Sequence, residues 1–188
     1  MVWRNDQVNE AETKRILSLA KECLGVEGDF VEMGCYKGDT SLLLAEIIQN
    51  DAHSVKKLWI YDSFEGLPEK GGEDESVMGV DFKKGELPVT KREVKVRFLK
   101  AGLPVPVIKK AWFADLTVDD MPRQIAFAFL DGDFYQSIKD SLELVGSLMN
   151  NDGIVVIHDY SNPALPGVKR AVDEWTLRHK AKFQMVLL

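Results

Sequence analysis

The chain has 188 residues, of which 45% are hydrophobic and 29% are charged, the composition of an ordinary globular protein rather than of a disordered one. This length suits one α/β domain over residues 1–188 with a sizeable core. The net charge of −6 argues against a general nucleic-acid-binding protein, because neutralising phosphate groups requires a basic surface.

The N-terminal sequence MVWRNDQVNEAETKR lacks the apolar core of a signal peptide. No stretch reaches the roughly 18 consecutive apolar residues that a membrane-spanning helix needs. We therefore expect a cytoplasmic, soluble protein with no membrane partner. Cys23 and Cys35 are too few for a disulfide scaffold and do not form a zinc signature, so we expect both to be reduced.

Helices and strands alternate along the first third of the chain. Apolar residues at helical spacing predict a helix over 8–24, and a short apolar run predicts a strand at 29–34. A second helix is expected from residue 42, with Asp39, Thr40 or Ser41 as its N-cap. The next strand is expected at 57–62 and ends on an acidic residue.

The middle of the chain differs in composition. Residues around 63–104 are richer in glycine, proline and charge, which predicts a lid-like insertion that carries a helix at 91–101. Further strands are expected at 105–109, 125–130, 153–157 and 183–188, and further helices at 136–149 and 167–180. The sequence Asn151-Asp152-Gly153 is expected to close the helix at 136–149.

This alternation predicts an α/β fold. Strands that are apolar throughout indicate an open, mostly parallel sheet of the Rossmann-like type, with helices on both faces. Acidic residues and glycines gather where the predicted strands end, and the carboxyl edge of such a sheet is where ligands bind. The pattern therefore predicts a binding site at that edge.

Glu32, Gly34 and Gly38 form an E-x-G-x-x-x-G loop between the first strand and the second helix. Gly34 permits a tight turn and close approach of a ligand, and the helix N-terminus suits a carboxylate or phosphate. The loop differs from the G-x-G-x-x-G pattern of dinucleotide sites, and Glu32 suits an ammonium group. S-adenosylmethionine has both a carboxylate and an ammonium group; a plain glycine-containing turn is the alternative. The residues expected to bind this cofactor here are Glu32, Gly34, Lys37, Gly38, Thr40 and Ser41.

Asp62 ends the second predicted strand, where a carboxylate can accept hydrogen bonds from both ribose hydroxyls of the cofactor. A simple turn-capping role is the alternative. Trp112 or Phe113 is a candidate to cover the adenine ring, although either also suits core packing. Ser63 and Asp131 complete the expected cofactor-binding set.

Acidic residues also follow two further strands: Asp131 and Asp133 after 125–130, and His158 and Asp159 after 153–157. Carboxylates at close range repel one another unless a cation compensates, and a divalent metal is the simplest such cation. Asp131, Asp159 and His158 are the candidate ligands, which leaves Asp133 as a general base. Such a site would activate an acceptor hydroxyl for attack on a sulfonium methyl group. The alternative is that these acids only cap turns.

Two other functions are compatible with the same residues. Asp131-Gly132-Asp133 matches the D-x-D pattern with which many glycosyltransferases hold a metal and a nucleotide-sugar diphosphate. The Glu32 loop and Asp62 argue against that alternative, because no diphosphate site is otherwise evident. A degenerate methyltransferase fold that acts as a scaffold is the non-catalytic alternative.

Several blocks occur together in order: Gly28-Asp-Phe-Val-Glu-Met-Gly34, Tyr61-Asp-Ser-Phe-Glu-Gly-Leu-Pro68, Leu130-Asp-Gly-Asp-Phe-Tyr135, His158-Asp-Tyr160 and Lys169-Arg-Ala-Val-Asp-Glu-Trp175. Together they resemble the macrocin O-methyltransferase (TylF-type) family, over about residues 26–175. The resemblance implies a class I methyltransferase fold, S-adenosylmethionine, Mg²⁺ or another divalent cation, and a small-molecule hydroxyl acceptor such as a sugar. It also implies that Asp131 is a metal ligand and Asp133 the base.

The chain departs from that family in two respects. The paired acids after the fifth strand fall on His158 and Asp159, and a histidine there would favour manganese, iron or zinc over magnesium, or weaken the metal site. Family members usually carry a further N-terminal segment and a further strand after the sixth, and we expect this chain to lack both. We therefore expect an acceptor pocket that is smaller, more open, or completed by a partner subunit in a homo-oligomer.

Overall fold

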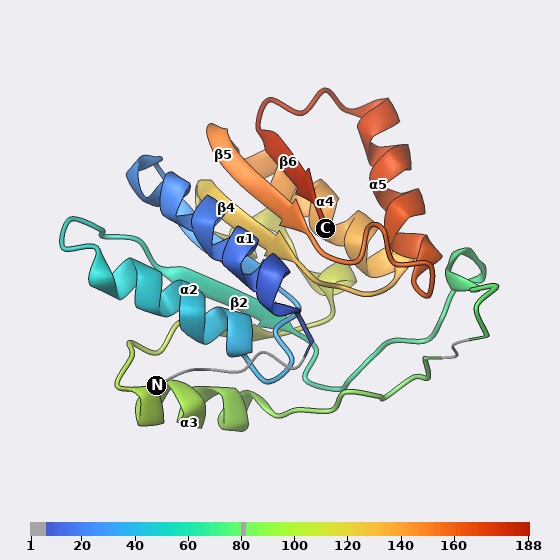
Figure 1. Cartoon of the computed structure of the whole chain (residues 1–188), viewed down its shortest axis with the longest axis horizontal. Coiled ribbons are helices and arrows are strands. Elements are labelled where there is room, and N and C mark those ends of the chain that lie inside the picture. The colour runs from blue at the N-terminus through green and yellow to red at the C-terminus, as the bar shows by residue number, and fades with distance from the viewer. Residues whose placement is uncertain (1–6, 80–81) are drawn as a thin grey trace.

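In the computed structural model, which describes residues 7–79 and 82–188, six strands form one parallel sheet in the order β3-β2-β1-β4-β5-β6 (Figure 1). The strands are β1 (Asp29–Met33), β2 (Leu58–Asp62), β3 (Val107–Lys110), β4 (Ile125–Leu130), β5 (Met149–Ile157) and β6 (Gln184–Leu187). The chain builds outward from β1 to β3 and then returns to the other side of β1. The order therefore reverses between β1 and β4, the place where such sheets bind ligands.

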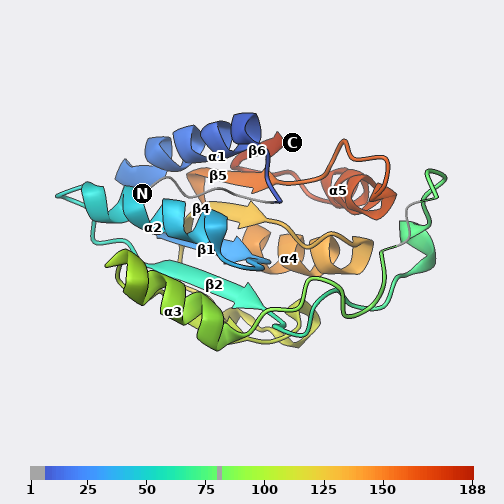
Figure 2. The same cartoon turned by 60° about the horizontal axis from the view of Figure 1, so that its bottom comes forward.

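Helices cover both faces of the sheet, as the sequence predicts (Figure 2). The helices α1 (Glu10–Glu22), α2 (Asp39–Asn50) and α3 (Lys91–Ala101) pack on one face, and α4 (Tyr135–Leu148) and α5 (Pro166–Arg178) pack on the other. Short 3₁₀ turns lie at Cys23–Gly25, Gly72–Asp74, Phe113–Asp115 and Val118–Asp120. Within the described residues, no helix is long and apolar enough to cross a membrane.

The central strands supply both halves of the core because their side chains alternate between the two faces. Phe30 and Phe127 point to the face that α1–α3 cover, whereas Val31 and Leu130 point to the α4–α5 face. All four side chains are fully buried. This two-sided burial explains why β4 is apolar throughout and why Phe30, Val31 and Met33 of β1 are apolar on both faces.

The predicted insertion divides into two parts. Val94 and Phe98 of α3 are fully buried in the core on the α1–α2 face, so α3 belongs to the body of the fold. The described residues of the 63–90 segment, 63–79 and 82–90, instead run along the carboxyl edge of the sheet towards α5 (Figure 2). Within this segment, the backbone of Leu67 pairs with that of residues 85–86. The Leu67 N–H donates to Glu86 O at 2.8 Å, and the Leu67 carbonyl accepts from Gly85 N at 2.9 Å.

The predicted N-cap of α2 was wrong. The cap is Gly38 in the left-handed region, with φ of 79°, and no side chain caps the helix. Asp39, Thr40 and Ser41 lie within the first turn and are buried. Glycine adopts this conformation without the steric cost that a Cβ would add, which is why the N-cap lies one to three residues earlier than expected.

The sequence Asn151-Asp152-Gly153 was predicted to form a turn that closes α4, but it lies within β5. The strand begins at Met149, directly after the helix. Its register against β4 jumps from Ile125↔Met149 to Phe127↔Ile154, so extra residues of β5 bulge out of the ladder. The turn-forming residues are therefore accommodated as a bulge, which sequence periodicity alone does not distinguish from a loop.

Candidate functional site

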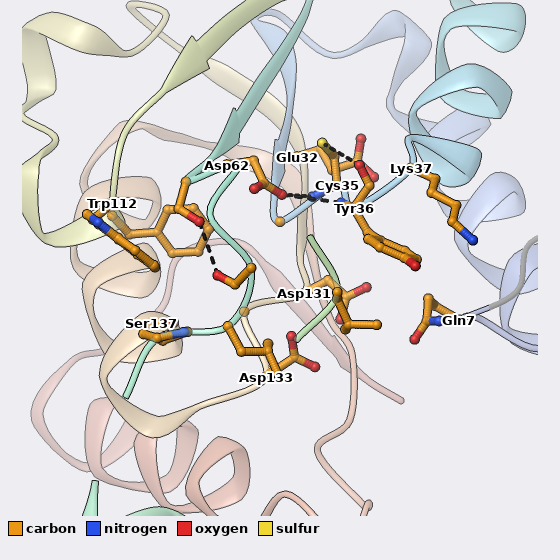
Figure 3. Close-up of a pocket in the computed structure, with 18 of the residues that line it drawn as sticks. Gln7, Glu32, Cys35, Tyr36, Lys37, Asp62, Trp112, Asp131, Asp133 and Ser137 are labelled. Atoms are coloured by element: carbon orange, nitrogen blue, oxygen red, sulfur yellow. Dashed lines mark hydrogen bonds between the residues drawn. The ribbon is translucent and has the colours of Figure 1, made fainter. Parts of the chain in front are cut away.

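A pocket opens at the carboxyl edge of the sheet, where β1, β2 and β4 end (Figure 3). The lining residues that the sequence singled out are Glu32, Gly34, Lys37, Thr40, Asp62, Ser63, Trp112, Phe113, Asp131 and Asp133. Gly38, the N-cap of α2, and Ser41, which donates a hydrogen bond to Glu32, are not among the lining residues.

Gly34 owes its identity to the sheet as much as to the pocket. Its φ is 89°, and a Cβ at this position would lie only 2.0 Å from the backbone oxygen of Asp131. The end of β1 therefore packs directly against the end of β4, which brings the first loop next to Asp131. Any larger residue would push these two strand ends apart.

Asp62 organises the loops around the pocket. Its Oδ2 accepts hydrogen bonds from the backbone N–H groups of Cys35 at 2.9 Å and Tyr36 at 3.2 Å (Figure 3). Its Oδ1 accepts from Phe64 N at 2.7 Å. The carboxylate thus holds together the loop after β1 and the turn after β2. Because Oδ1 accepts only one of these bonds, it retains a lone pair for a further donor.

Glu32 is an acidic side chain enclosed almost entirely by protein, with 1% of its surface exposed. Ser41 donates a short hydrogen bond to its Oε2. Burial raises the pKa of Glu32 to about 8, the Ser41 hydrogen bond opposes that rise, and the charges of Asp131, Asp62 and Asp39 add to it. A carboxyl group in this environment gains most from a ligand that brings a positive charge.

Trp112 lies across the pocket from Tyr36 (Figure 3), Phe113 also lines the pocket, and both residues are partly exposed. This placement suits the covering of a flat ring. Phe113 also packs against the core on the α4–α5 face, which confirms the alternative expectation of core packing.

Asp133 occupies a strained turn beside Asp131. Its φ is 60°, and the N–H of Phe134 donates to Gly132 O at 2.7 Å, which closes a tight three-residue turn around it. Burial raises the pKa of Asp133 well above its ordinary range, and the charges of Asp131 and Asp159 add to this effect. A carboxylate with a raised pKa is a stronger proton acceptor when it is ionised.

His158 lies between the carboxylates of two neighbouring strand ends. Its Nδ1 is 3.0 Å from Asp131 Oδ1 and 3.0 Å from Asp159 Oδ2, and the residue is buried. Burial by itself would lower the pKa of His158, but its hydrogen bonds to both carboxylates and their charges raise it to about 11. Without a bound cation, His158 is therefore protonated, and its single positive charge offsets part of the negative charge of the two carboxylates.

The same three residues fit a divalent cation. Their ligand atoms all lie within 4.8 Å of one another. An octahedral ion with bonds of about 2.1 Å places neighbouring ligands about 3 Å apart, which matches the two separations at Nδ1. Nε2 of His158 lies 3.4 Å from Glu12 Oε2, and a proton held there leaves Nδ1 free to bind an ion. The three ligands that the sequence predicted therefore lie together.

Sequence reasoning missed several residues that shape this site. Glu12 of α1 reaches His158 across 146 positions of sequence, and Gln7 and Leu87 line the pocket from distant segments. Their sequence contexts are an ordinary first helical turn and two loops, so no local pattern could have identified them. Cys35 also lines the pocket and, like Cys23, is a free thiol, as expected.

Comparison with known proteins gives a match to one family. The family model described as macrocin-O-methyltransferase (TylF) matches residues 11–187. A relative from Streptomyces olivaceus, 8-demethyl-8-(2,3-dimethoxy-alpha-L-rhamnosyl)-tetracenomycin-C 4'-O-methyltransferase, is 31% identical over 160 residues, which cover 82% of this chain and 60% of the relative. The chain therefore spans well under two thirds of that protein's length.

Solved structures share the fold. The O-methyltransferase NovP has a TM-score of 0.77 and 28% identity, over 88% of this chain and 71% of that one. An O-methyltransferase from Bacillus cereus, solved in complex with SAH, has a TM-score of 0.63 over 93% of this chain and 73% of that one. Its 12% identity supports the fold alone.

Proposed function

Because the chain belongs to the macrocin O-methyltransferase family, we propose that it is an S-adenosylmethionine-dependent O-methyltransferase. Its acceptor is a small molecule with a free hydroxyl group, such as a sugar or another natural-product hydroxyl. The relative from Streptomyces olivaceus carries the name of a sugar O-methyltransferase, which supports this class of acceptor. The observation that carries the proposal is one pocket containing Glu32, Asp62, Asp131 and Asp133 at the switch point of the sheet.

The cofactor would bind along the first loop. Glu32 would take the ammonium group, since a buried carboxyl group is stabilised by a neighbouring cation. Asp62 would hold the Cys35–Tyr36 backbone in position and use the remaining lone pair of Oδ1 for a ribose hydroxyl. Trp112 would cover the adenine ring.

Asp133 is the proposed general base. When bound, S-adenosylmethionine supplies an electrophilic methyl group, and a divalent cation lowers the pKa of a neighbouring acceptor hydroxyl. Asp133 would hold the proton that this hydroxyl loses, because its carboxylate lies in the pocket beside Asp131 (Figure 3). The positive φ of Asp133 sets the direction of its side chain relative to Asp131.

The proposed cation site consists of Asp131, His158 and Asp159, with Glu12 orienting the imidazole ring. A nitrogen ligand shifts preference away from magnesium and towards manganese, iron or zinc. The cytoplasmic location and the three arrangements of the acceptor pocket stay predictions from the sequence.

Calorimetry with S-adenosylhomocysteine, together with UDP as a matched control, tests the proposed cofactor. We expect S-adenosylhomocysteine to bind and UDP not to bind. Transfer of a radioactive methyl group from S-adenosylmethionine to a panel of deoxysugar glycosides then tests the acceptor class. Binding of UDP alone would contradict the proposal and favour a nucleotide-sugar glycosyltransferase.

A further inference from the structure

Asp74 is a buried acidic residue of the 63–90 segment that the proposed chemistry does not use. Only 2% of its surface is exposed. Its Oδ1 accepts a 2.7 Å hydrogen bond from the backbone N–H of Tyr135, and its Oδ2 accepts one of 3.1 Å from Gly71 N. Burial raises the pKa of Asp74, and both hydrogen bonds oppose that rise. A carboxyl group that is costly to bury is thus kept at one defined position.

This carboxylate supplies the N-cap that α4 lacks. The residue at the cap position, Phe134, has no side-chain oxygen, and Tyr135 is the first residue of the helix. The first N–H groups of a helix have no partner within it, and a nearby anion stabilises them. Asp74 therefore caps α4 from a segment 61 residues away in the sequence.

The start of α5 confirms how closely this carboxylate is fitted. A Cβ at Gly167, in the first turn of α5, would lie 1.8 Å from Oδ1 of Asp74 and 2.9 Å from the Tyr135 nitrogen. Asp74 is thus enclosed between the N-termini of two helices. Only glycine at position 167 leaves room for it.

The capped residue directly follows the strained turn around Asp133. That turn has a positive φ at Asp133 and the Phe134 N to Gly132 O hydrogen bond of 2.7 Å. Strained backbone of this kind persists only when its surroundings hold it. On one side the turn continues from β4, and on the other it enters α4 at the N–H that Asp74 binds.

We propose that Asp74 is a positioning residue that holds the Asp133 turn in its active geometry through the first N–H of α4. The 63–90 segment would then be part of the catalytic machinery rather than only a cover over the pocket. The catalytic half of this inference rests on the proposed function, whereas its structural half, the coupling of Asp74 to the 131–138 backbone, does not.

Hydrogen exchange of the 131–138 backbone tests the coupling without an acceptor. Asp74→Ala removes the cap, and Gly167→Ala displaces the carboxylate without altering it. In both variants we expect the backbone amides of residues 131–138 to exchange about tenfold faster than in wild type, which is the usual effect of a lost N-cap. The difference should appear both with saturating S-adenosylhomocysteine and without it. Asp74→Asn keeps an acceptor oxygen and should restore slow exchange.

Ser76→Ala is the matched control. Ser76 Oγ donates to Pro163 O at 2.8 Å, so it anchors the segment to the loop before α5 rather than to the first N–H of α4. In Ser76→Ala, the exchange rates of the 131–138 amides should equal those of wild type. Unchanged exchange in Gly167→Ala, or equally fast exchange in Ser76→Ala, would overturn the proposal even if Asp74→Ala fails to fold.

Turnover tests the catalytic half. In Gly167→Ala we expect kcat to fall about tenfold while the KM for S-adenosylmethionine stays within about twofold, because the first loop is untouched. A folded variant with fast exchange and normal kcat would refute the positioning role. If wild type transfers no methyl group, the proposed function fails, but the exchange results still decide whether Asp74 holds this turn.

Discussion

The buried carboxyl group of Glu32 should couple cofactor binding to proton release. Its pKa of about 8 means that roughly 0.9 of the side chains are protonated at pH 7 in the empty pocket. If Glu32 holds the ammonium group of the cofactor, it must ionise on binding, because only the carboxylate form attracts that group. Binding at pH 7 should then release about 0.9 proton per site.

The same reasoning sets the size of the pH effect on affinity. The apparent Kd equals the Kd of the ionised form multiplied by one plus the ratio of protonated to ionised Glu32. With a pKa of about 8, that factor falls from about 100 at pH 6 to about 11 at pH 7, a roughly ninefold gain in affinity. The sign is therefore tighter binding as the pH rises towards 8.

Calorimetry with S-adenosylhomocysteine in buffers of different ionisation enthalpy measures both quantities. Glu32→Gln cannot ionise, so it should bind more weakly and lose most of the proton release. Ser41→Ala removes the hydrogen bond that holds the pKa of Glu32 down, so its pH dependence should move to higher pH. A Kd that is equal at pH 6 and 7, or proton release that persists in Glu32→Gln, would refute this role of Glu32.

Three other substitutions address the remaining site residues. Asp133→Asn should abolish methyl transfer while the Kd for S-adenosylhomocysteine stays within about threefold, because the base is not needed for binding; normal turnover would exclude that role. Asp62→Ala removes three hydrogen bonds to a charged group, so we expect the free energy of unfolding, measured by thermal denaturation, to fall by at least about 1.5–3 kcal/mol. We also expect at least tenfold weaker cofactor binding; unchanged affinity would contradict a role for Asp62 in the site. His158→Asp should shift metal preference from Mn²⁺ towards Mg²⁺ in equilibrium dialysis, whereas Glu12→Ala should lower Mn²⁺ affinity about 10–100-fold; equal affinities in all three proteins would refute the cation site.

Most of the fold could be predicted from periodicity and composition. The continuous apolar run of β4 indicated a sheet buried on both faces, and the order of strands and helices indicated parallel pairing. Errors arose where a local pattern has two structural outcomes. Asn151-Asp152-Gly153 favours a turn but lies in a bulge within β5, and Gly38, rather than a polar side chain, begins α2.

The candidate site divides in the same way. Residues at strand ends, such as Glu32, Asp62 and Asp131, could be recognised because the carboxyl ends of parallel strands meet at one edge. The protonation state and hydrogen-bond partners of each group could not be predicted, because desolvation and hydrogen bonding depend on neighbours that are remote in sequence. Asp62, for example, turned out to bind three backbone N–H groups of the loops around it.

The cluster at Asp131 and Asp159 shows this difference most clearly. Strand ends and acidic residues can be recognised from local sequence, which allowed the prediction that His158 lies beside the carboxylates of Asp131 and Asp159. Glu12 and Asp74 reach the site only because α1 and the 63–90 segment fold back over the sheet edge. Their contribution is set by tertiary packing, since each acts across 61 or more positions through one hydrogen bond that no local pattern encodes.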